Sequence, residues 1–219
     1  RSIRNRKMKD EKETGKKLQD AAKKEFLEKG FQKASLRNIC KNAGVTTGAL
    51  YFFFRDKDEL FESLVMEPVE EVRNLMVEHY RSELEMIDNG ETVKEDFSDD
   101  AECTGKIIEK IYQHKEAFEL LLMKAQGSKL EGVLDGFVEI TEQHYRHLAD
   151  ETSRQLKTRR IGDKMIHWMS HMQIDTFVYM VEHIETAEEA FEYMETVVSY
   201  MINGWYGMFQ DVVSEHEKQ

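Results

Sequence analysis

A single proline, Pro68, interrupts this chain of 219 residues, and that scarcity narrows the folds open to it. Proline lacks a backbone N–H and breaks helices, so a chain almost free of it can carry long helices. Leu, Met, Glu, Lys and Ala, which occur readily in helices, are abundant. Strand-like alternation of apolar and polar residues persists over only a few positions. The sequence therefore predicts an all-α protein.

Segments that would target the chain to a membrane or for export are not found in the sequence. No run of about 18 apolar residues could span a bilayer, and the opening RSIRNRKMKD lacks the apolar region of a secretion signal. The two cysteines, Cys40 and Cys103, have neither a CxxC spacing nor a His partner at zinc-finger distance. We therefore expect a cytoplasmic protein with two free thiols.

Charge divides the chain into a basic and an acidic part. Residues 1–57 contain 16 Lys and Arg against 7 Asp and Glu, a net charge of +9, although the whole chain carries −12. Residues 58–219 carry −21. A basic segment on an acidic body is typical of a protein that binds a polyanion with one lobe, although charge alone also fits a solvated basic face without a partner.

Two helices are predicted in the basic part. From Thr14, apolar residues at helical spacing, such as Leu18 and Phe26, indicate one helical face, and Gly30 is suited to end that helix. The basic segment before Thr14 is expected to be a flexible arm. Ser35 can cap a second, short helix that ends at Gly44, a position suited to a left-handed backbone.

A third helix, TGALYFFF, follows two residues after Gly44, with Thr46 as its cap. This spacing predicts a helix-turn-helix, whose second helix enters the DNA major groove by its N-terminal residues. Thr46, Thr47 and Gly48 are small enough to let the backbone approach bases. Leu50 and Phe54 are expected to be buried, since they lie four residues apart on one face.

Side chains around this unit are candidates for phosphate contacts. Tyr51 is predicted to face outward with a phenol that can hydrogen-bond to phosphate. Asp56 and Glu59 have the spacing of a capping box that opens a fourth helix at Lys57, and a helix N-terminus with a lysine favours phosphate. Arg37, near the start of the second helix, is either a phosphate contact or an ordinary exposed arginine.

From about Thr14 to Val65 the chain resembles the TetR family of bacterial transcription regulators. The resemblance rests on the first helix, on ASLRNICKNAGVTTGALYFFFRDKDEL and on the lysine that opens the next helix. It implies that the third helix reads the major groove, that Tyr51 and Lys57 hold phosphates, and that the residues from Thr46 to Gly48 lie against backbone or bases. Many members carry a His where this chain has Phe52 and Phe53, so a phosphate contact by that His is not carried over.

The resemblance also implies a domain order and a partner. Residues 1–60 would form a helix-turn-helix DNA-binding domain, and residues 61–219 a helical ligand-binding and dimerisation domain. The protein would then be a ligand-responsive regulator, a repressor, that binds a palindromic operator on double-stranded DNA as a homodimer. A ligand that prefers one arrangement of the body would tilt the helix of Lys57 and change the separation of the two recognition helices.

The acidic part reads as about five long helices, with breaks near 88–90, 127–128, 160–162 and 185–186. The last two, Asp163 to Ile184 and Ala187 to Val213, are apolar over most of their faces, which predicts a four-helix dimer interface. Methionines and large aromatics suit a pocket for an apolar or aromatic effector. The candidate pocket residues are Met123, Trp168, Met172, Tyr179 and Trp205, although most methionines and aromatics of this part are expected in the core or the dimer interface.

Other kinds of function find little support in the sequence. His167, His171 and Asp175 lie on one side of one helix, but a single helix face does not close a coordination sphere, so no metal and no cofactor are expected. Motifs of nucleotide-binding, hydrolytic and zinc-dependent enzymes do not occur, nor does the Glu-x-x-His spacing of di-metal bundles. A helical-bundle metal-dependent enzyme and an adaptor that does not bind DNA remain the alternatives.

Overall fold

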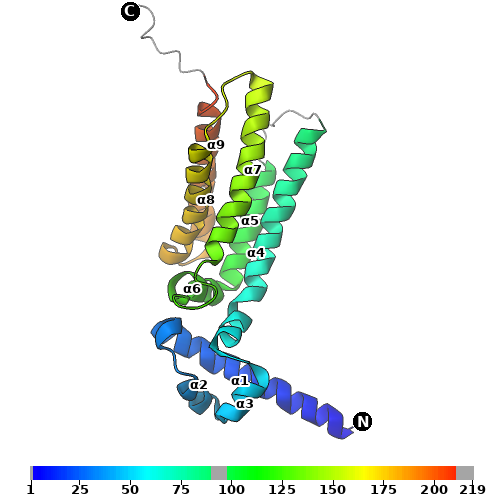
Figure 1. Ribbon diagram of the computed structural model, residues 1–219, viewed down its shortest axis with the longest axis vertical. Coiled ribbons are helices and arrows are strands. Elements are labelled where there is room, and N and C mark those ends of the chain that lie inside the picture. Colours follow the sequence, from blue (N-terminus) through cyan, green and yellow to red (C-terminus); the bar gives the residue numbers. More distant parts are fainter. Residues whose placement is uncertain (1, 90–97, 211–219) are drawn as a thin grey trace, which may run out of the picture. The chain divides into compact units, whose positions relative to one another are not determined.

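The computed structural model describes residues 2–89 and 98–210, and the regular structure in these residues is α-helix (Figure 1). The helices of this part are α1 Ser2–Lys33, α2 Leu36–Ala43, α3 Thr47–Phe53, α4 Lys57–Asp88, α5 Ser98–Gln113, α6 Lys115–Lys124, α7 Val133–Leu156, α8 Asp163–His183 and α9 Ala187–Gly207. The predicted all-α fold is confirmed. Among these helices, none is both long and apolar enough to cross a membrane.

The chain divides into two compact units that do not follow a single cut in the sequence. Unit 1 comprises Arg1–Glu71 and Gln113–Val133, and unit 2 comprises Val72–Tyr112 and Leu134–Gln219. Unit 1 takes in α6 because that helix packs against α1, where Lys23 forms an ion pair with Glu116. The sequence-based division at residue 60, which concerned function, stays a prediction.

Unit 1 is built around apolar side chains of α1 and α4. Leu18, Phe26 and Phe61 are fully buried, as the predicted face of the first helix requires. The ring of Phe26 lies 5.9 Å from that of Phe31 and 5.1 Å from that of Phe61, the latter edge to face. Such aromatic contacts add to the free energy gained by burying the rings.

The first helix is longer than predicted. α1 begins at Ser2 rather than near Thr14, so the backbone of the basic segment, expected as a flexible arm, is helical. The side chains of residues 1–9 lie outside the described part of the structure. Gly30 does break the helix: its φ of 74° and ψ of 163° are not helical, and α1 is kinked there before it ends at Lys33.

Unit 2 is a bundle in which α5, α7, α8, α9 and the later part of α4 lie side by side (Figure 1). A core cluster in this unit joins four helices through Ile87 of α4, Leu148 of α7, Ile166 of α8 and Trp205 of α9. The predicted breaks between helices are confirmed within the described residues. The last helix was predicted to reach Val213 but ends at Gly207, and residues 211–213 lie outside the described part. The separation of α5 from α6 at His114 was not predicted.

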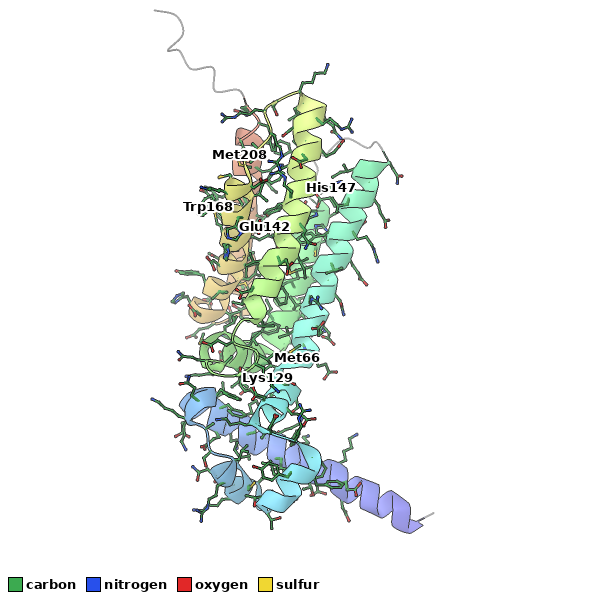
Figure 2. The ribbon with its side chains drawn as sticks, viewed as in Figure 1. Met66, Lys129, Glu142, His147, Trp168 and Met208 are labelled. Atoms are coloured by element: carbon green, nitrogen blue, oxygen red, sulfur yellow. The ribbon has the colours of Figure 1, made fainter. Side chains whose placement is uncertain are left out.

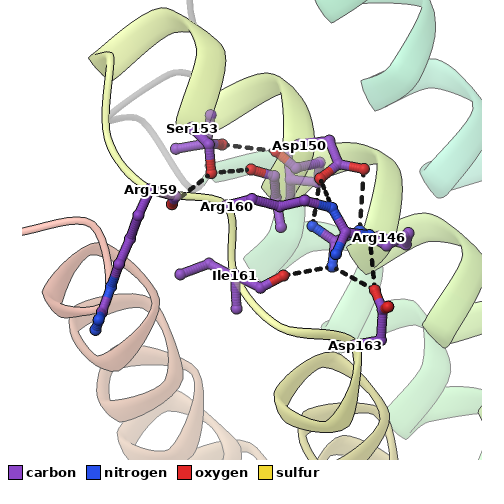
Figure 3. Close-up of polar contacts among 10 residues, drawn as sticks. Arg146, Asp150, Ser153, Arg159, Arg160, Ile161 and Asp163 are labelled. Carbon is purple, nitrogen blue, oxygen red and sulfur yellow. Dashed lines mark hydrogen bonds and ion pairs between the residues drawn. The ribbon is translucent and has the colours of Figure 1, made fainter.

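Arg146 fixes the connection between α7 and α8 (Figure 3). Its guanidinium donates to the carbonyl oxygen of Ile161 at 2.7 Å and to Asp163 at 3.2 Å, and forms an ion pair with Asp150. Arg160 pairs with the same two carboxylates. Because a planar guanidinium can address several acceptors at once, these contacts set the angle at which the chain enters α8.

Glu25 is a buried carboxylate that joins α1 to the start of α2. Its side chain is 3% exposed, and Oε1 accepts hydrogen bonds from Lys29 Nζ at 2.9 Å, from the backbone N–H of Ser35 at 3.2 Å and from Asn38 Nδ2 at 3.5 Å. Burial by itself would raise the pKa of Glu25, but the hydrogen bonds from Lys29, Ser35 and Asn38 outweigh it and lower the pKa.

We expect Glu25→Gln to lower the free energy of unfolding at pH 7 by about 1–3 kcal/mol, because Lys29, the N–H of Ser35 and the amide of Asn38 lose an ionised acceptor. A pKa lowered on folding contributes stability above the unfolded value of about 4.5, and this stability is lost as pH falls through the folded pKa. The difference between wild type and variant should therefore shrink below about pH 4.5. Denaturant unfolding across this pH range checks it. Glu28→Gln, at an exposed position on α1, is the control, and an equal effect there would contradict the prediction.

Candidate nucleic-acid interface and effector cavity

The turn between α2 and α3 has the predicted capping at each end. Ser35 Oγ accepts from the N–H of Asn38 at 3.4 Å, and Thr46 Oγ1 accepts from the N–H of Ala49 at 3.1 Å. Gly44 ends α2 with φ 69° and ψ 31°, a left-handed conformation in which any side chain would be strained. The predicted helix-turn-helix geometry is therefore present in unit 1.

Burial on one side of α3 leaves its small residues on the outside. Leu50 is fully buried and Phe54 is 9% exposed, as predicted. Thr46, Thr47 and Gly48 are exposed, and a Cβ added at Gly48 would meet only Thr46 Oγ1, at 3.8 Å. Nothing in the fold of unit 1 therefore requires a glycine there, whereas close approach of another molecule would.

Two aromatic side chains extend from the same helix into solvent. Tyr51 is 58% exposed and Phe52 is 71% exposed. Phe53 instead turns back toward α1, where its ring would lie 3.6 Å from a Cβ added at Gly15. The exposed phenol of Tyr51 can donate a hydrogen bond to a phosphate oxygen, and the ring of Phe52 offers an apolar surface beside it.

The ammonium group of Lys57, predicted to hold a phosphate, has backbone partners in this structure. Nζ donates to the carbonyl oxygens of Phe31 at 2.7 Å, Gln32 at 3.3 Å and Ala34 at 3.4 Å, and it lies 4.4 Å from the centre of the Phe31 ring. The last carbonyls of a helix lack helical donors, so a cation there stabilises the end of α1. Nζ could bind a phosphate only if it gave up its hydrogen bond to one of these carbonyl oxygens. Arg37, by contrast, is exposed on α2.

The predicted capping box at the start of α4 is present in a modified form. Asp56 Oδ1 accepts from the N–H of Glu59 at 2.8 Å, which is the first half of the box. Glu59 Oε2 accepts from the N–H of Arg55 at 2.6 Å instead of from that of Asp56. The backbone N–H of Lys129 donates to Asp58 at 2.8 Å, so the loop after α6 also supports this helix start.

Unit 2 contains a cavity of about 430 Å³, within the size range of small-molecule sites. Six methionines line it: Met86, Met165, Met169, Met172, Met201 and Met208. Six large aromatics line it as well: Tyr80, Tyr145, Trp168, Tyr200, Trp205 and Tyr206. Figure 2 marks Trp168 on α8 and Met208 just beyond α9. Flexible thioethers beside flat rings form a wall that can adapt to differently shaped apolar ligands.

The five candidate pocket residues are distributed over three places. Trp168, Met172 and Trp205 line the cavity. Tyr179 lies in a shallower groove along α8, which Trp168 and Met172 also border. Met123 lies on α6, in unit 1, and is 41% exposed.

Polar groups gather on the α4 and α7 side of the cavity. His79 Nε2 lies 3.1 Å from Asp100 Oδ1, and this hydrogen bond raises the pKa of His79 against the effect of burial. His144 Nε2 lies 2.9 Å from Glu83 Oε2. Burial raises the pKa of Tyr80 to about 12, so its hydroxyl stays protonated and can donate.

Sequence reasoning missed this polar group. His79 and Glu83 lie four residues apart, which places them on one face of α4, and that spacing was the available signal. Asp100 comes from α5 and could not be assigned to them without the fold. His167, a candidate ligand from sequence, is not part of this group: it is exposed on α8, with Nδ1 2.8 Å from Glu142 Oε2.

The first part of the chain is similar to a family of bacterial regulators. Residues 18–64 match the family model described as bacterial regulatory proteins, tetR family. An HTH-type transcriptional regulator of Staphylococcus aureus (strain USA300) is 22% identical over 200 residues, which cover 89% of this chain and 94% of that protein. The HTH-type transcriptional repressor BepR of Brucella suis biovar 1 (strain 1330) is 47% identical over 45 residues, which cover 20% of this chain and 22% of that protein.

Solved structures share the fold along most of the chain. Native NalD, described as the secondary repressor of the MexAB-OprM multidrug efflux pump in Pseudomonas aeruginosa, aligns with a TM-score of 0.57 and 17% identity. The alignment covers 89% of this chain and 97% of NalD. A gamma-butyrolactone receptor (ArpA like protein) aligns with a TM-score of 0.55 and 19% identity, over 86% of this chain and 87% of the receptor. At these identities the likeness concerns the fold.

We expect Lys57→Met to lower the free energy of unfolding by about 1–3 kcal/mol, because the carbonyls at the end of α1 lose their charged donor. If this contact persists on DNA, the slope of log affinity against log salt concentration should not change. Thermal unfolding and DNA titrations at several salt concentrations check both points. Lys24→Met, an exposed lysine of α1, is the stability control. A slope reduced by about one with unchanged stability would instead assign Lys57 to phosphate.

Proposed function

We propose that this chain, a transcriptional regulator of the tetR family, represses transcription by binding a palindromic DNA operator as a homodimer and releases it when a small effector occupies the cavity of unit 2. The observation that carries the proposal is the orientation of α3. Leu50 of this helix and Phe54 at its C-terminal end are buried, while Thr47, Gly48, Tyr51 and Phe52 face solvent. A helix that shows small and hydrogen-bonding residues outward is suited to the major groove.

Each exposed residue has a proposed part in DNA binding. Thr46, Thr47 and Gly48 lie at the N-terminus of α3, where a recognition helix meets base edges, and Gly48 allows the backbone to come close. Tyr51 and Arg37 contact phosphates on either side. Residues 1–57 carry a net charge of +9, which attracts DNA at long range, whereas the acidic remainder of the chain repels it.

The proposed dimer interface lies on α8 and α9. Exposed apolar side chains of these helices include Trp168 at 53%, Tyr179 at 52% and Tyr200 at 68%. Large exposed apolar surfaces are uncommon on monomers and favour association. A two-fold dimer is also what a palindromic operator requires, because each half-site then meets one recognition helix.

The effector and repressor roles draw on the cavity and on the relatives. The cavity combines apolar walls with a few polar groups, the usual composition of a ligand site. Two proteins similar to this chain are described as repressors, and a third as a receptor for gamma-butyrolactone. Since α4 begins in unit 1 and ends in unit 2, a ligand that prefers one conformation of unit 2 can act on the start of the same helix.

We expect Arg37→Ala to weaken operator binding and to reduce the slope of log affinity against log salt concentration by about one, because one phosphate contact is lost.

Tyr51→Phe should weaken binding by roughly tenfold, as one hydrogen bond of about 1.4 kcal/mol is lost, and should leave the slope unchanged. An operator selected from a random duplex library serves as the probe in fluorescence anisotropy titrations.

Arg81→Ala is the matched control, since Arg81 is also an exposed arginine but lies in unit 2. Its slope and affinity should equal those of the wild type. Binding that does not depend on salt, or equal affinities for all these variants, would contradict the proposed interface and favour an adaptor that does not use DNA.

We expect Tyr179→Glu to convert the dimer to a monomer, because the new charge would have to be buried between two copies of α8. Analytical ultracentrifugation measures the mass. Leu156→Glu is the control, as Leu156 is 54% exposed but lies at the end of α7. A wild-type monomer, or a Tyr179→Glu dimer of unchanged affinity, would contradict this interface.

A further inference from the structure

Three acidic and imidazole side chains converge on one wall of the cavity in unit 2. His79 and Glu83 lie one turn apart on α4, and Asp100 lies in the first turn of α5. One donor atom from each side chain lies within 4.8 Å of the others, and His79 Nε2 is 3.1 Å from Asp100 Oδ1. All three are partly buried and line the cavity. Within the described residues, this is the one group with such spacing.

His144 of α7 adds a second, independent feature to this group. Its side chain is 4% exposed, its ring stacks on Tyr80 with centroids 3.9 Å apart, and its Nε2 lies 2.9 Å from Glu83 Oε2. Its other nitrogen, Nδ1, is buried without a hydrogen-bond partner in the described structure, although His144 lines the cavity. A buried polar atom without a partner is costly and calls for an explanation.

The charge of the cavity wall favours a cation. Its lining residues include three carboxylates, those of Glu83, Asp99 and Asp100, and no Lys or Arg. Two of these carboxylates lie within hydrogen-bond distance of a histidine nitrogen, Asp100 of His79 Nε2 and Glu83 of His144 Nε2, and an ionised carboxylate accepts from such a nitrogen. Negative charge in a partly buried wall without a lysine or arginine attracts a positive ligand more strongly than it would in water.

We propose that His79, Glu83 and Asp100 bind a divalent first-row transition-metal ion, with His144 as the residue that orients Glu83. An imidazole nitrogen with two carboxylate oxygens suits zinc, manganese or ferrous iron, whereas calcium and magnesium prefer oxygen ligands alone. Bonds of about 2.0–2.2 Å require donor atoms roughly 3–3.5 Å apart. His79 and Asp100 are already at this separation, and a carboxylate oxygen of Glu83 lies within 4.8 Å of both donor atoms.

The remaining coordination positions would face the cavity. Three protein ligands leave at least one position for water or for a donor atom of a small molecule. The metal could then bind alone or together with an organic ligand held by the methionines and aromatics. In this respect the inference deepens the effector role proposed above, but the metal site itself rests only on the geometry of unit 2.

An organic ammonium ion is the competing occupant. Aromatic rings and carboxylates also attract such cations. The geometry favours the metal, because three donor atoms within 4.8 Å leave no room for the substituents of a tetraalkylammonium ion between them. Nε2 of His79 becomes a metal ligand when it releases its proton, whereas a tetraalkylammonium ion has no N–H to donate to it.

The test uses the full-length, tag-free protein after removal of metal with a chelator. Zinc and manganese chloride are titrated separately by calorimetry and by tryptophan fluorescence. Both tryptophans of the chain, Trp168 and Trp205, line the cavity, so the emission reports on this site. We expect one ion per chain and a change in emission, with magnesium and calcium giving neither.

Conservative variants identify the ligands. Glu83→Gln and Asp100→Asn keep the side-chain shape and should each weaken binding by about 100-fold, as His79→Gln should. His144→Phe keeps a ring on Tyr80 but removes the contact with Glu83, and should weaken binding by about tenfold at unchanged stoichiometry and thermal stability. His171→Gln, on the exposed face of α8, is the matched control and should bind as the wild type does.

The outcomes separate the site from its role. Equal affinity in wild type and the three ligand variants, or no binding of either ion, would overturn the metal site. Quenching by tetraethylammonium that zinc does not displace would also overturn it and assign the wall to organic cations. Metal binding that leaves operator affinity unchanged would support the site and overturn its effector role. A protein that binds zinc at this site but no DNA would support the site and contradict the proposed function alone.

Discussion

The burial of Leu50 and Phe54 is the contact on which the proposed DNA-reading helix, α3, depends. α3 has seven residues, and a helix of that length is not stable alone in water. It persists because Thr46 caps its first turn and because these two side chains are buried in unit 1. The inward side of α3 therefore supplies the stability, and the outward side is free to carry Thr47 and Gly48, which contribute little to it. A larger apolar residue outside would add nothing to the fold and would keep the backbone away from bases.

Local features of unit 1 could be predicted from sequence because each depends on residues close together in the chain. Ser35, Gly44 and Thr46 act within one helical turn, and they form the caps that their types indicate. The partners of Lys57 could not be predicted in this way, since the carbonyl of Phe31 is 26 residues distant. The inclusion of α6 in unit 1 likewise depends on its packing against α1, which no local pattern encodes.

In unit 2 the composition predicted the character of the cavity better than its position. Methionines and aromatics do form its wall, but helices that are apolar over most of their faces give no sign of which side faces a cavity. Trp168 and Tyr179 lie on the same helix, and only the first lines the cavity. The polar wall was harder still, because Asp100 meets His79 only when α4 and α5 pack together. A site formed by residues of separate helices can therefore be recognised only once the packing of these helices is known.

The proposed control of DNA binding from the cavity would act through α4, which begins in unit 1 and ends in unit 2. It begins at Lys57, which holds the end of α1, and it later carries His79 and Glu83. Pro68 lies on α4 between Lys57 and His79. Because proline has no N–H, the carbonyl of Leu64 lacks its helical donor, and bending α4 at this point requires less free energy. A ligand changes DNA affinity only by as much as its own affinity differs between two conformations of this helix. A metal ion bound by residues of both α4 and α5 would have different affinities for two such conformations. Any movement of α4 against α5 changes the distances between the atoms that bind the ion.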